Sequence, residues 1–190
     1  IKNFKGKIHI SLGMTTIQET EEIIEFYKKY KKLDSLVLYA CTSGYPVPPK
    51  DICLLEINYI IDKYKKHVKE YGFSGHHNGI APDIAALTLG LIQNRIFDIK
   101  FNYIERHFTL DRTWKGTDHA ASLEPDGIRK LVRDIRNVTQ ALNYKSSEIL
   151  DIEWSSRQKL KMLTKSSHNN GHVAASIIKS KNSNRPKYLN

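Results

Sequence analysis

Short apolar runs alternate with longer amphipathic segments along the first three quarters of the chain. Four runs have the length and residue types of β-strands, at 7–11, 36–41, 71–74 and 101–108. Each is followed by a segment with apolar residues at helical spacing, and the clearest stripe runs from Ile128 to Leu142. This alternation is typical of βα units, so we expect an α/β fold with a parallel sheet.

Local signals suggest where the helices begin and end. Thr15 with Gln18 resembles a capping box for the first helix. Pro82 stands where the third helix would begin, and Gly90 is expected to end it. Glu124 or Asp126 can serve the N-terminus of the fourth helix.

The charge of the chain is unevenly distributed. The 190 residues carry a net charge of +10, but residues 161–190 hold six Lys and Arg residues and no Asp or Glu. The rest of the chain is close to balance and shows no basic face with interleaved aromatic residues, so we expect no nucleic-acid partner. The tail is rich in Ser, Asn and Lys, which favours a flexible end.

Two further features concern the cellular location of the protein. No apolar run approaches the roughly 20 residues of a membrane span, so we expect no membrane association. Cys41 and Cys53 lack the spacing of a zinc knuckle. We interpret them as reduced core thiols, which fits a cytoplasmic protein.

The carboxyl ends of the predicted strands carry polar residues suited to chemistry. In parallel α/β sheets and barrels, sites form at these ends. The rule selects four segments: Ser11-Leu12-Gly13, Thr42-Ser43-Gly44-Tyr45, Ser74-Gly75-His76-His77 and Glu105-Arg106-His107.

Two histidines in these segments are expected to converge. Side chains two apart share a face of a strand, so His76 points with Ser74, and His107 points with Glu105. If the third and fourth strands are neighbours, both imidazoles reach the same rim. Two imidazoles suit Mn²⁺ or another divalent metal when water and substrate oxygens complete the site. Ordinary hydrogen-bonded rim histidines would give the same pattern, so the residues alone leave both interpretations open.

Other residues at these ends suit an anionic or hydroxylated ligand. Ser11, Ser43 and Ser74 stand near strand-to-helix junctions, where hydroxyl and backbone N–H groups can receive phosphate or carboxylate. The proline-rich loop would hold Tyr45 over the rim, although a packed loop tyrosine is the alternative. The long connection 109–125 carries polar residues that fit either a sugar-like ligand or a solvated surface loop.

Several motifs together resemble the sialic acid synthase family. They are CTSGYPVPPKD, GFSGHH, IERHFTLDRTWKGTDHAASLEPDGIRKLV and the GMTT turn, and the match runs in order from about Lys7 to Leu142. The resemblance implies a (β/α)₈ TIM barrel, of which this chain is similar to strands five to eight. It also implies condensation of phosphoenolpyruvate with N-acetylmannosamine or a related sugar. In that reaction C3 of phosphoenolpyruvate attacks the sugar aldehyde, water adds at C2 and phosphate leaves with C–O cleavage.

The resemblance also implies roles for individual residues. His76 and His107 fall on its metal positions, for Mn²⁺ with Mg²⁺ or Co²⁺ as alternatives. The remaining assignments are phosphoenolpyruvate contacts at Ser11, Ser43 and Ser74, sugar contacts at Tyr45 and Asp118, and a catalytic helper at Glu105. His77 is a variable neighbour rather than a ligand. Many members read Ser-Asp-His-Thr where this chain reads Ser-Gly-His-His, which leaves Gly75 unexplained.

The resemblance also sets expectations for domains and partners. Residues 1–145 are expected to form the second half of a barrel, 146–163 a segment leading out of it, and 164–190 the flexible basic tail. We expect no antifreeze-like domain in this chain. A half-barrel has open sheet edges, so we expect it to need the N-terminal half or a homo-oligomer partner. The competing hypothesis is an inactive or incomplete fragment that acts only as a binding or assembly module.

Overall fold

The structure is a computed structural model that describes residues 2–161. The chain divides into two compact units, Ile1–Ala141 and Leu142–Asn190. The predicted tail at 164–190 lies outside the described residues. The second unit contains one described helix, α5 (Asp151–Leu160), where Glu153 accepts a hydrogen bond from the Leu150 backbone N–H and pairs with Lys145.

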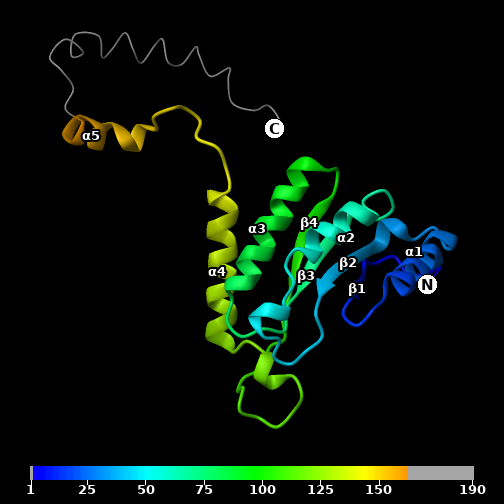
Figure 1. Ribbon diagram of the computed structural model, residues 1–190. Helices are drawn as coiled ribbons and strands as arrows, with labels where there is room; N and C mark the ends of the chain where they lie inside the picture. The colour runs from blue at the N-terminus through cyan, green and yellow to red at the C-terminus, as the bar shows by residue number, and fades with distance from the viewer. Residues whose placement is uncertain (1, 162–190) are drawn as a thin grey trace. The chain divides into compact units, whose positions relative to one another are not determined.

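The first unit is built from four successive βα units (Figure 1). Its strands are β1 (Ile8–Ser11), β2 (Leu36–Cys41), β3 (Glu70–Ser74) and β4 (Lys100–Glu105). Its α-helices are α1 (Ile17–Lys29), α2 (Glu56–Tyr64), α3 (Ala81–Ile96) and α4 (Pro125–Ala141). Three 3₁₀ turns lie between them, η1 (Leu33–Ser35), η2 (Pro49–Asp51) and η3 (His119–Ala121).

The four strands form one parallel sheet in the order β1-β2-β3-β4. In register, Ser11 lies beside Tyr39, and Ser74 lies beside both Cys41 and Glu105. All four carboxyl ends therefore meet at one edge of the sheet. The predicted α/β class with a parallel sheet is confirmed.

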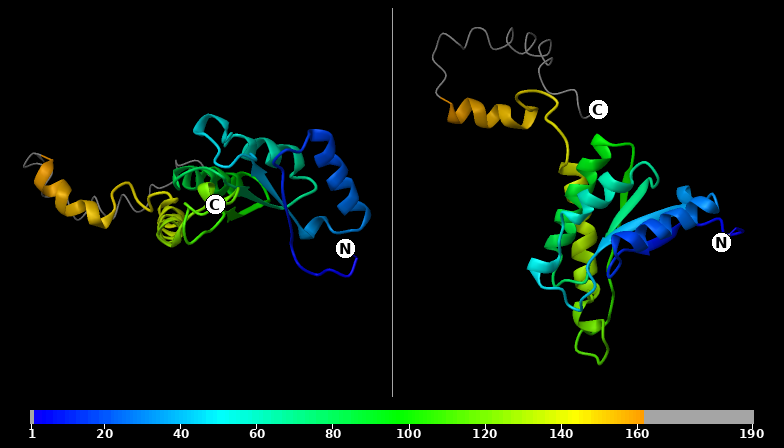
Figure 2. Two further views of the ribbon diagram at one scale, coloured as in Figure 1. Left: turned by 90° about the horizontal axis from the view of Figure 1, so that it is seen from below. Right: turned by 45° about the vertical axis from the view of Figure 1, so that its right-hand side comes forward.

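One face of the sheet packs against the helices (Figure 2). Alternate residues of β2, namely Leu36, Leu38 and Ala40, join Tyr71, Phe73 and Phe101 in a core with the apolar sides of α1, α2 and α3. This two-residue alternation is what places the next residue of each strand on the opposite face.

That opposite face is polar and aromatic. His9 Nδ1 lies 2.7 Å from the Tyr39 hydroxyl, and the Tyr103 hydroxyl donates to Glu70 at 2.8 Å. Burial raises the pKa of Tyr39 to about 12, and the negative charges of Tyr103 and Glu105 add to this shift. Tyr39 therefore stays neutral near pH 7.

The capping prediction for α1 was wrong by one residue. The capping box is formed by Thr16 and Glu19: the Glu19 N–H donates to Thr16 Oγ1 at 3.1 Å, and the Thr16 N–H donates to Glu19 at 2.7 Å. Thr15 instead donates from its hydroxyl to the Leu12 carbonyl. Both pairs of residues have the spacing of the motif, so the sequence did not distinguish them.

The prediction that Gly90 ends the third helix was also wrong, because α3 continues to Ile96. A Cβ built on Gly90 would lie 2.1 Å from the ring of Phe101. Gly90 is thus the residue that lets α3 approach β4, and the packing gain outweighs the low helix propensity of glycine.

Two further expectations need correction. β4 ends at Glu105 rather than at Phe108, so His107 lies in the loop beyond the strand. Cys41 is partly buried in β2, but Cys53 is exposed and so is not a core thiol. Among the helices of residues 2–161, none is long and apolar enough to cross a membrane.

Candidate metal centre

The candidate site lies where β3 and β4 end. His76 follows β3 by two residues, and Glu105 and His107 belong to the end of β4 and the loop after it. Backbone hydrogen bonds hold the loops that carry His76 and His107. The Val47 N–H donates to the His76 carbonyl at 2.9 Å, and the Leu123 N–H donates to the His107 carbonyl at 2.8 Å. The convergence predicted for His76 and His107 is present, with ring centroids 4.9 Å apart.

Three side chains here offer a coherent set of metal ligands. One ligand atom each from His76, Glu105 and His107 lies within 4.8 Å of the others. Two imidazoles and one carboxylate suit Mn²⁺, Co²⁺ and other first-row divalent ions, and they leave coordination positions open for water or substrate. The residues present therefore fit a divalent metal.

Hydrogen bonding leaves the correct nitrogen of His76 free. Its Nδ1 lies 3.0 Å from the backbone carbonyl of Thr42, which can only accept, so we place the proton on Nδ1. Nε2 then carries the lone pair that a metal needs. A ligand imidazole tethered through its other nitrogen is the usual arrangement in protein metal sites.

Glu105 is held by Ser74. The buried Ser74 hydroxyl donates to Glu105 Oε2 at 2.7 Å, which orients the carboxylate toward the two histidines. A serine hydroxyl has one proton, so this bond competes with the contact to phosphoenolpyruvate predicted for Ser74. In this arrangement Ser74 supports Glu105.

Tyr45 lies over the two histidines, as the sequence predicts. Its ring centroid is 4.5 Å from that of His76 and 5.7 Å from that of His107, on which it stacks. Burial raises the pKa of Tyr45, as do the nearby charges of Asp118, Cys41 and Glu105, while the Ser43 hydroxyl opposes the shift. The phenol is therefore a neutral hydrogen-bonding group at the mouth of the site.

Asp118 reaches the site from the loop before η3. Its Oδ2 lies 3.6 Å from Nδ1 of His107, and its side chain is 51% exposed. This carboxylate can orient the His107 ring and still face a ligand.

The serines of the first two strand ends stand apart from this cluster. Ser11 is exposed at the end of β1. Ser43 adjoins the loop after β1, since a Cβ built on Gly13 would lie 2.3 Å from its Oγ. Neither hydroxyl makes a hydrogen bond to His76, Glu105 or His107 within the part of the chain that the structure describes. Their predicted contacts with phosphoenolpyruvate remain predictions.

The residue that the sequence left unexplained, Gly75, has a steric role. A Cβ at this position would lie 2.7 Å from Cε1 of His77 and 2.8 Å from the ring of Phe73. The His77 ring thus occupies the space beside Gly75. That ring is buried and lies near Asp83 and Arg106, a grouping that the sequence did not predict.

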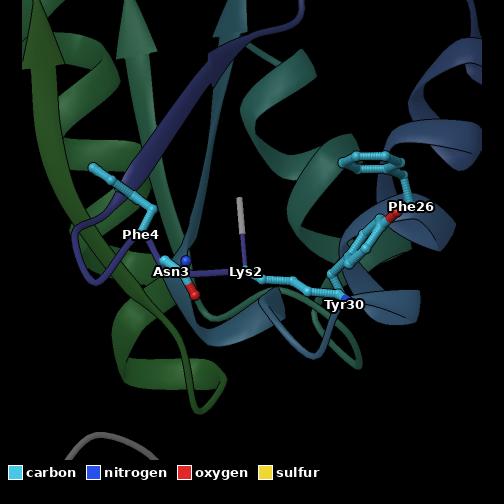
Figure 3. Close-up of a pocket in the computed structure, with 5 residues that line it drawn as sticks. All are labelled: Lys2, Asn3, Phe4, Phe26 and Tyr30. Carbon is cyan, nitrogen blue, oxygen red and sulfur yellow. The ribbon is translucent and has the colours of Figure 1, made fainter.

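A hollow lies at the other end of the sheet (Figure 3). It has a volume of about 570 Å³ and is lined by Lys2, Asn3, Phe4, Phe26 and Tyr30. Its lining comes from the segment before β1 and from the end of α1, so it is remote from the histidines. It contains no His, Cys, Asp or Glu that could serve as a metal ligand.

Comparison with known proteins identifies the family. The model of the NeuB family matches residues 1–147, which include every residue of the candidate site. The chain belongs to the NeuB family. The sialic acid synthase resemblance inferred from the sequence motifs is thereby confirmed.

Two relatives of this chain are named synthases. N-acetylneuraminate-9-phosphate synthase of Homo sapiens is 36% identical over 153 residues, covering 80% of this chain and 38% of that protein. N,N'-diacetyllegionaminic acid synthase of Campylobacter jejuni is 34% identical over 143 residues, covering 75% of this chain and 39% of that protein. The chain thus spans less than half the length of these curated relatives.

A solved structure shares the fold. The N-acetylneuraminic acid synthetase of Leptospira borgpetersenii, crystallised with citrate, superposes with a TM-score of 0.60 at 28% identity. The match covers 83% of this chain and 51% of that one. The chain therefore shares its fold with a solved structure of a sialic acid synthetase, in agreement with the family match.

Proposed function

We propose that this chain forms part of the site of a transferase that condenses phosphoenolpyruvate with N-acetylmannosamine or a related sugar. It would supply strands five to eight of a (β/α)₈ barrel. The observation that carries the proposal is the grouping of His76, Glu105 and His107 within 4.8 Å at the strand ends of a NeuB-family chain.

The reaction forms one carbon–carbon bond and one carbon–oxygen bond to water, and it breaks the carbon–oxygen bond to phosphate. C3 of phosphoenolpyruvate attacks the open-chain aldehyde, water adds at C2, and inorganic phosphate leaves with the C2 oxygen. A divalent metal, Mn²⁺ in our proposal, supplies Lewis-acid polarisation of the aldehyde oxygen.

Each residue of the candidate site then has a proposed role. His76 and His107 would hold the metal, and Glu105 would complete the set or accept a proton at its free oxygen. Tyr45 and Asp118 stand beside the histidines, where they can bind sugar hydroxyl groups. Ser11 and Ser43 lie on the neighbouring strand ends, where they can receive the phosphate or carboxylate of phosphoenolpyruvate.

A second candidate rests on the chain's coverage of its relatives. The chain covers only 38% of the human relative. It contains four βα units, whereas a complete (β/α)₈ barrel has eight. Such a piece could act as a binding or assembly module that needs an N-terminal half or a second copy.

Phosphate release from phosphoenolpyruvate distinguishes the two candidates. We expect the 190-residue chain alone to have little or no activity with Mn²⁺ and N-acetylmannosamine. A protein extended by the first four βα units should release phosphate, and removal of the metal with EDTA should abolish the release. If the extended protein is inactive with N-acetylmannosamine, its phosphate ester and diacetamido sugars alike, the module is the better account.

A further inference from the structure

A buried ionic cluster lies behind the candidate metal centre. Its members are His77, Asp83 and Arg106, whose side chains are 2%, 0% and 2% exposed. Two of them are next in sequence to the candidate metal ligands, since His77 follows His76 and Arg106 precedes His107. The proposed reaction uses none of the three.

Arg106 holds three separate segments together. Its Nη1 lies 2.5 Å from Asp83 Oδ2, in the first turn of α3, and 3.0 Å from both His77 Nε2 and the Gly79 carbonyl. Its Nη2 donates to the His77 carbonyl at 2.6 Å and to the Ala121 carbonyl at 3.3 Å. The guanidinium, carried by the loop after β4, therefore ties together the loop after β3, the first turn of α3 and η3.

This arrangement depends on the shape of an arginine side chain. The two terminal nitrogens of the guanidinium reach different parts of His77. Nη1 lies beside the imidazole ring, and Nη2 donates to the backbone carbonyl. A lysine has one nitrogen, which can pair with Asp83 but leaves the His77 and Ala121 carbonyls without that donor. Asp83 balances the buried positive charge, which would otherwise be strongly disfavoured.

We propose that Arg106, with His77 and Asp83, forms a positioning cluster that sets the spacing of His76 and His107. Arg106 fixes the carbonyl of His77, one residue from His76, while its own backbone carries His107. The metal-binding consequence rests on the proposed function, but the claim about ring spacing does not. Gly75 contributes to the same positioning cluster, because the absence of a Cβ leaves the space that the His77 ring occupies.

The test compares Arg106→Lys with Arg129→Lys in the 190-residue chain. Arg129 also pairs with an aspartate, Asp126, but both of these side chains are exposed on α4. The first readout, without metal, is the NMR nuclear Overhauser effect between the His76 and His107 rings, whose centroids are 4.9 Å apart. The second is the dissociation constant for Mn²⁺, measured by electron paramagnetic resonance. Circular dichroism records the folded fraction.

We expect Arg106→Lys to weaken or remove the ring-to-ring effect and to weaken Mn²⁺ binding by about 10- to 100-fold, the usual range for residues that orient metal ligands. Arg129→Lys should change neither readout. If Arg106→Lys does not fold, Asp83→Asn replaces it, because it keeps the side-chain volume and weakens the hold on Arg106.

A folded Arg106→Lys or Asp83→Asn variant with an unchanged ring-to-ring effect would overturn the positioning role. If the natural chain binds no Mn²⁺, the proposed metal site fails, yet the ring-to-ring effect still decides whether Arg106 sets the spacing. The two claims are thus separable.

Discussion

The carboxyl end of the sheet has two halves that differ in kind. At β3 and β4, His76, Glu105 and His107 gather within 4.8 Å, and hydrogen bonds from Ser74 and to Thr42 orient two of them. The hydroxyl groups of Ser11 and Ser43 at β1 and β2 lie outside that cluster, and the segment after β2 contributes to it only the Thr42 carbonyl and the Tyr45 ring, which contact His76. The difference indicates that the metal ligands lie in the β3–β4 half, while the hydroxyl groups of the β1–β2 half suit binding of an anion.

The largest effect should come from the two histidines. His76→Ala or His107→Ala should weaken Mn²⁺ binding by about 100-fold or more, because each removes one ligand of a small set. Titration calorimetry of the 190-residue chain would measure this. His67→Ala, which removes an exposed histidine elsewhere, is the matched control and should leave the affinity unchanged. Full Mn²⁺ affinity in His76→Ala would contradict the difference between the two halves.

Gly75→Ala should destabilise the fold by about 1–3 kcal/mol, because the added Cβ would overlap the His77 ring. Urea unfolding at pH 7 would measure the change. The double variant Gly75→Ala/His77→Ala should lose the part of the steric effect that comes from the His77 ring, while the overlap with Phe73 remains. Gly127→Ala, whose Cβ would meet the movable Leu123 side chain at 3.3 Å, is the control. Equal stability of Gly75→Ala and the natural chain would show that the His77 ring does not need this space.

Glu105→Gln should weaken Mn²⁺ binding by about 10-fold, and Ser74→Ala by less, because Ser74 acts only through the carboxylate. Ser11→Ala should have no effect on the same titration. A larger loss in Ser11→Ala than in Glu105→Gln would reverse the assignment of metal chemistry to the β3–β4 half.

The smallest effect concerns Glu70, at the other end of β3. Burial disfavours its charged form, but hydrogen bonds from Lys7 and Tyr103 outweigh that cost and lower its pKa below the ordinary value. A carboxyl with a lowered pKa stabilises the fold above its unfolded pKa of about 4.3, and the gain is lost as the pH falls through the folded pKa. Glu70→Gln should thus destabilise by about 1 kcal/mol at pH 7, and the difference should shrink in thermal melts as the pH falls through the folded pKa of Glu70. A difference that persists at low pH would mean that packing, rather than charge, explains it.

Much of the fold could be predicted because local patterns and sheet geometry agree. The apolar runs predicted the four strands, and side-chain alternation predicted that His76 and His107 reach one rim, where they lie just beyond the ends of β3 and β4. The errors arose where a tertiary contact overrides a local signal. Gly90 resembles a helix end, but it is a contact point for Phe101.

The cluster of His77, Asp83 and Arg106 could not be predicted from spacing. Asp83 lies in the first turn of α3, where an acidic residue is ordinarily explained by the helix dipole. Arg106 is separated from Asp83 by 23 residues, and only the packing of α3 beside β4 joins them. The position of Arg106 directly before the candidate metal ligand His107 was the one feature of the sequence that pointed to the cluster.

The most direct test of the account is anomalous X-ray diffraction from crystals of this chain soaked with Mn²⁺. The account predicts one strong peak within coordination distance of Nε2 of His76 and Nε2 of His107, with Glu105 beside it. No peak at these three side chains under saturating Mn²⁺, or a peak elsewhere that survives the His76→Ala substitution, would contradict it.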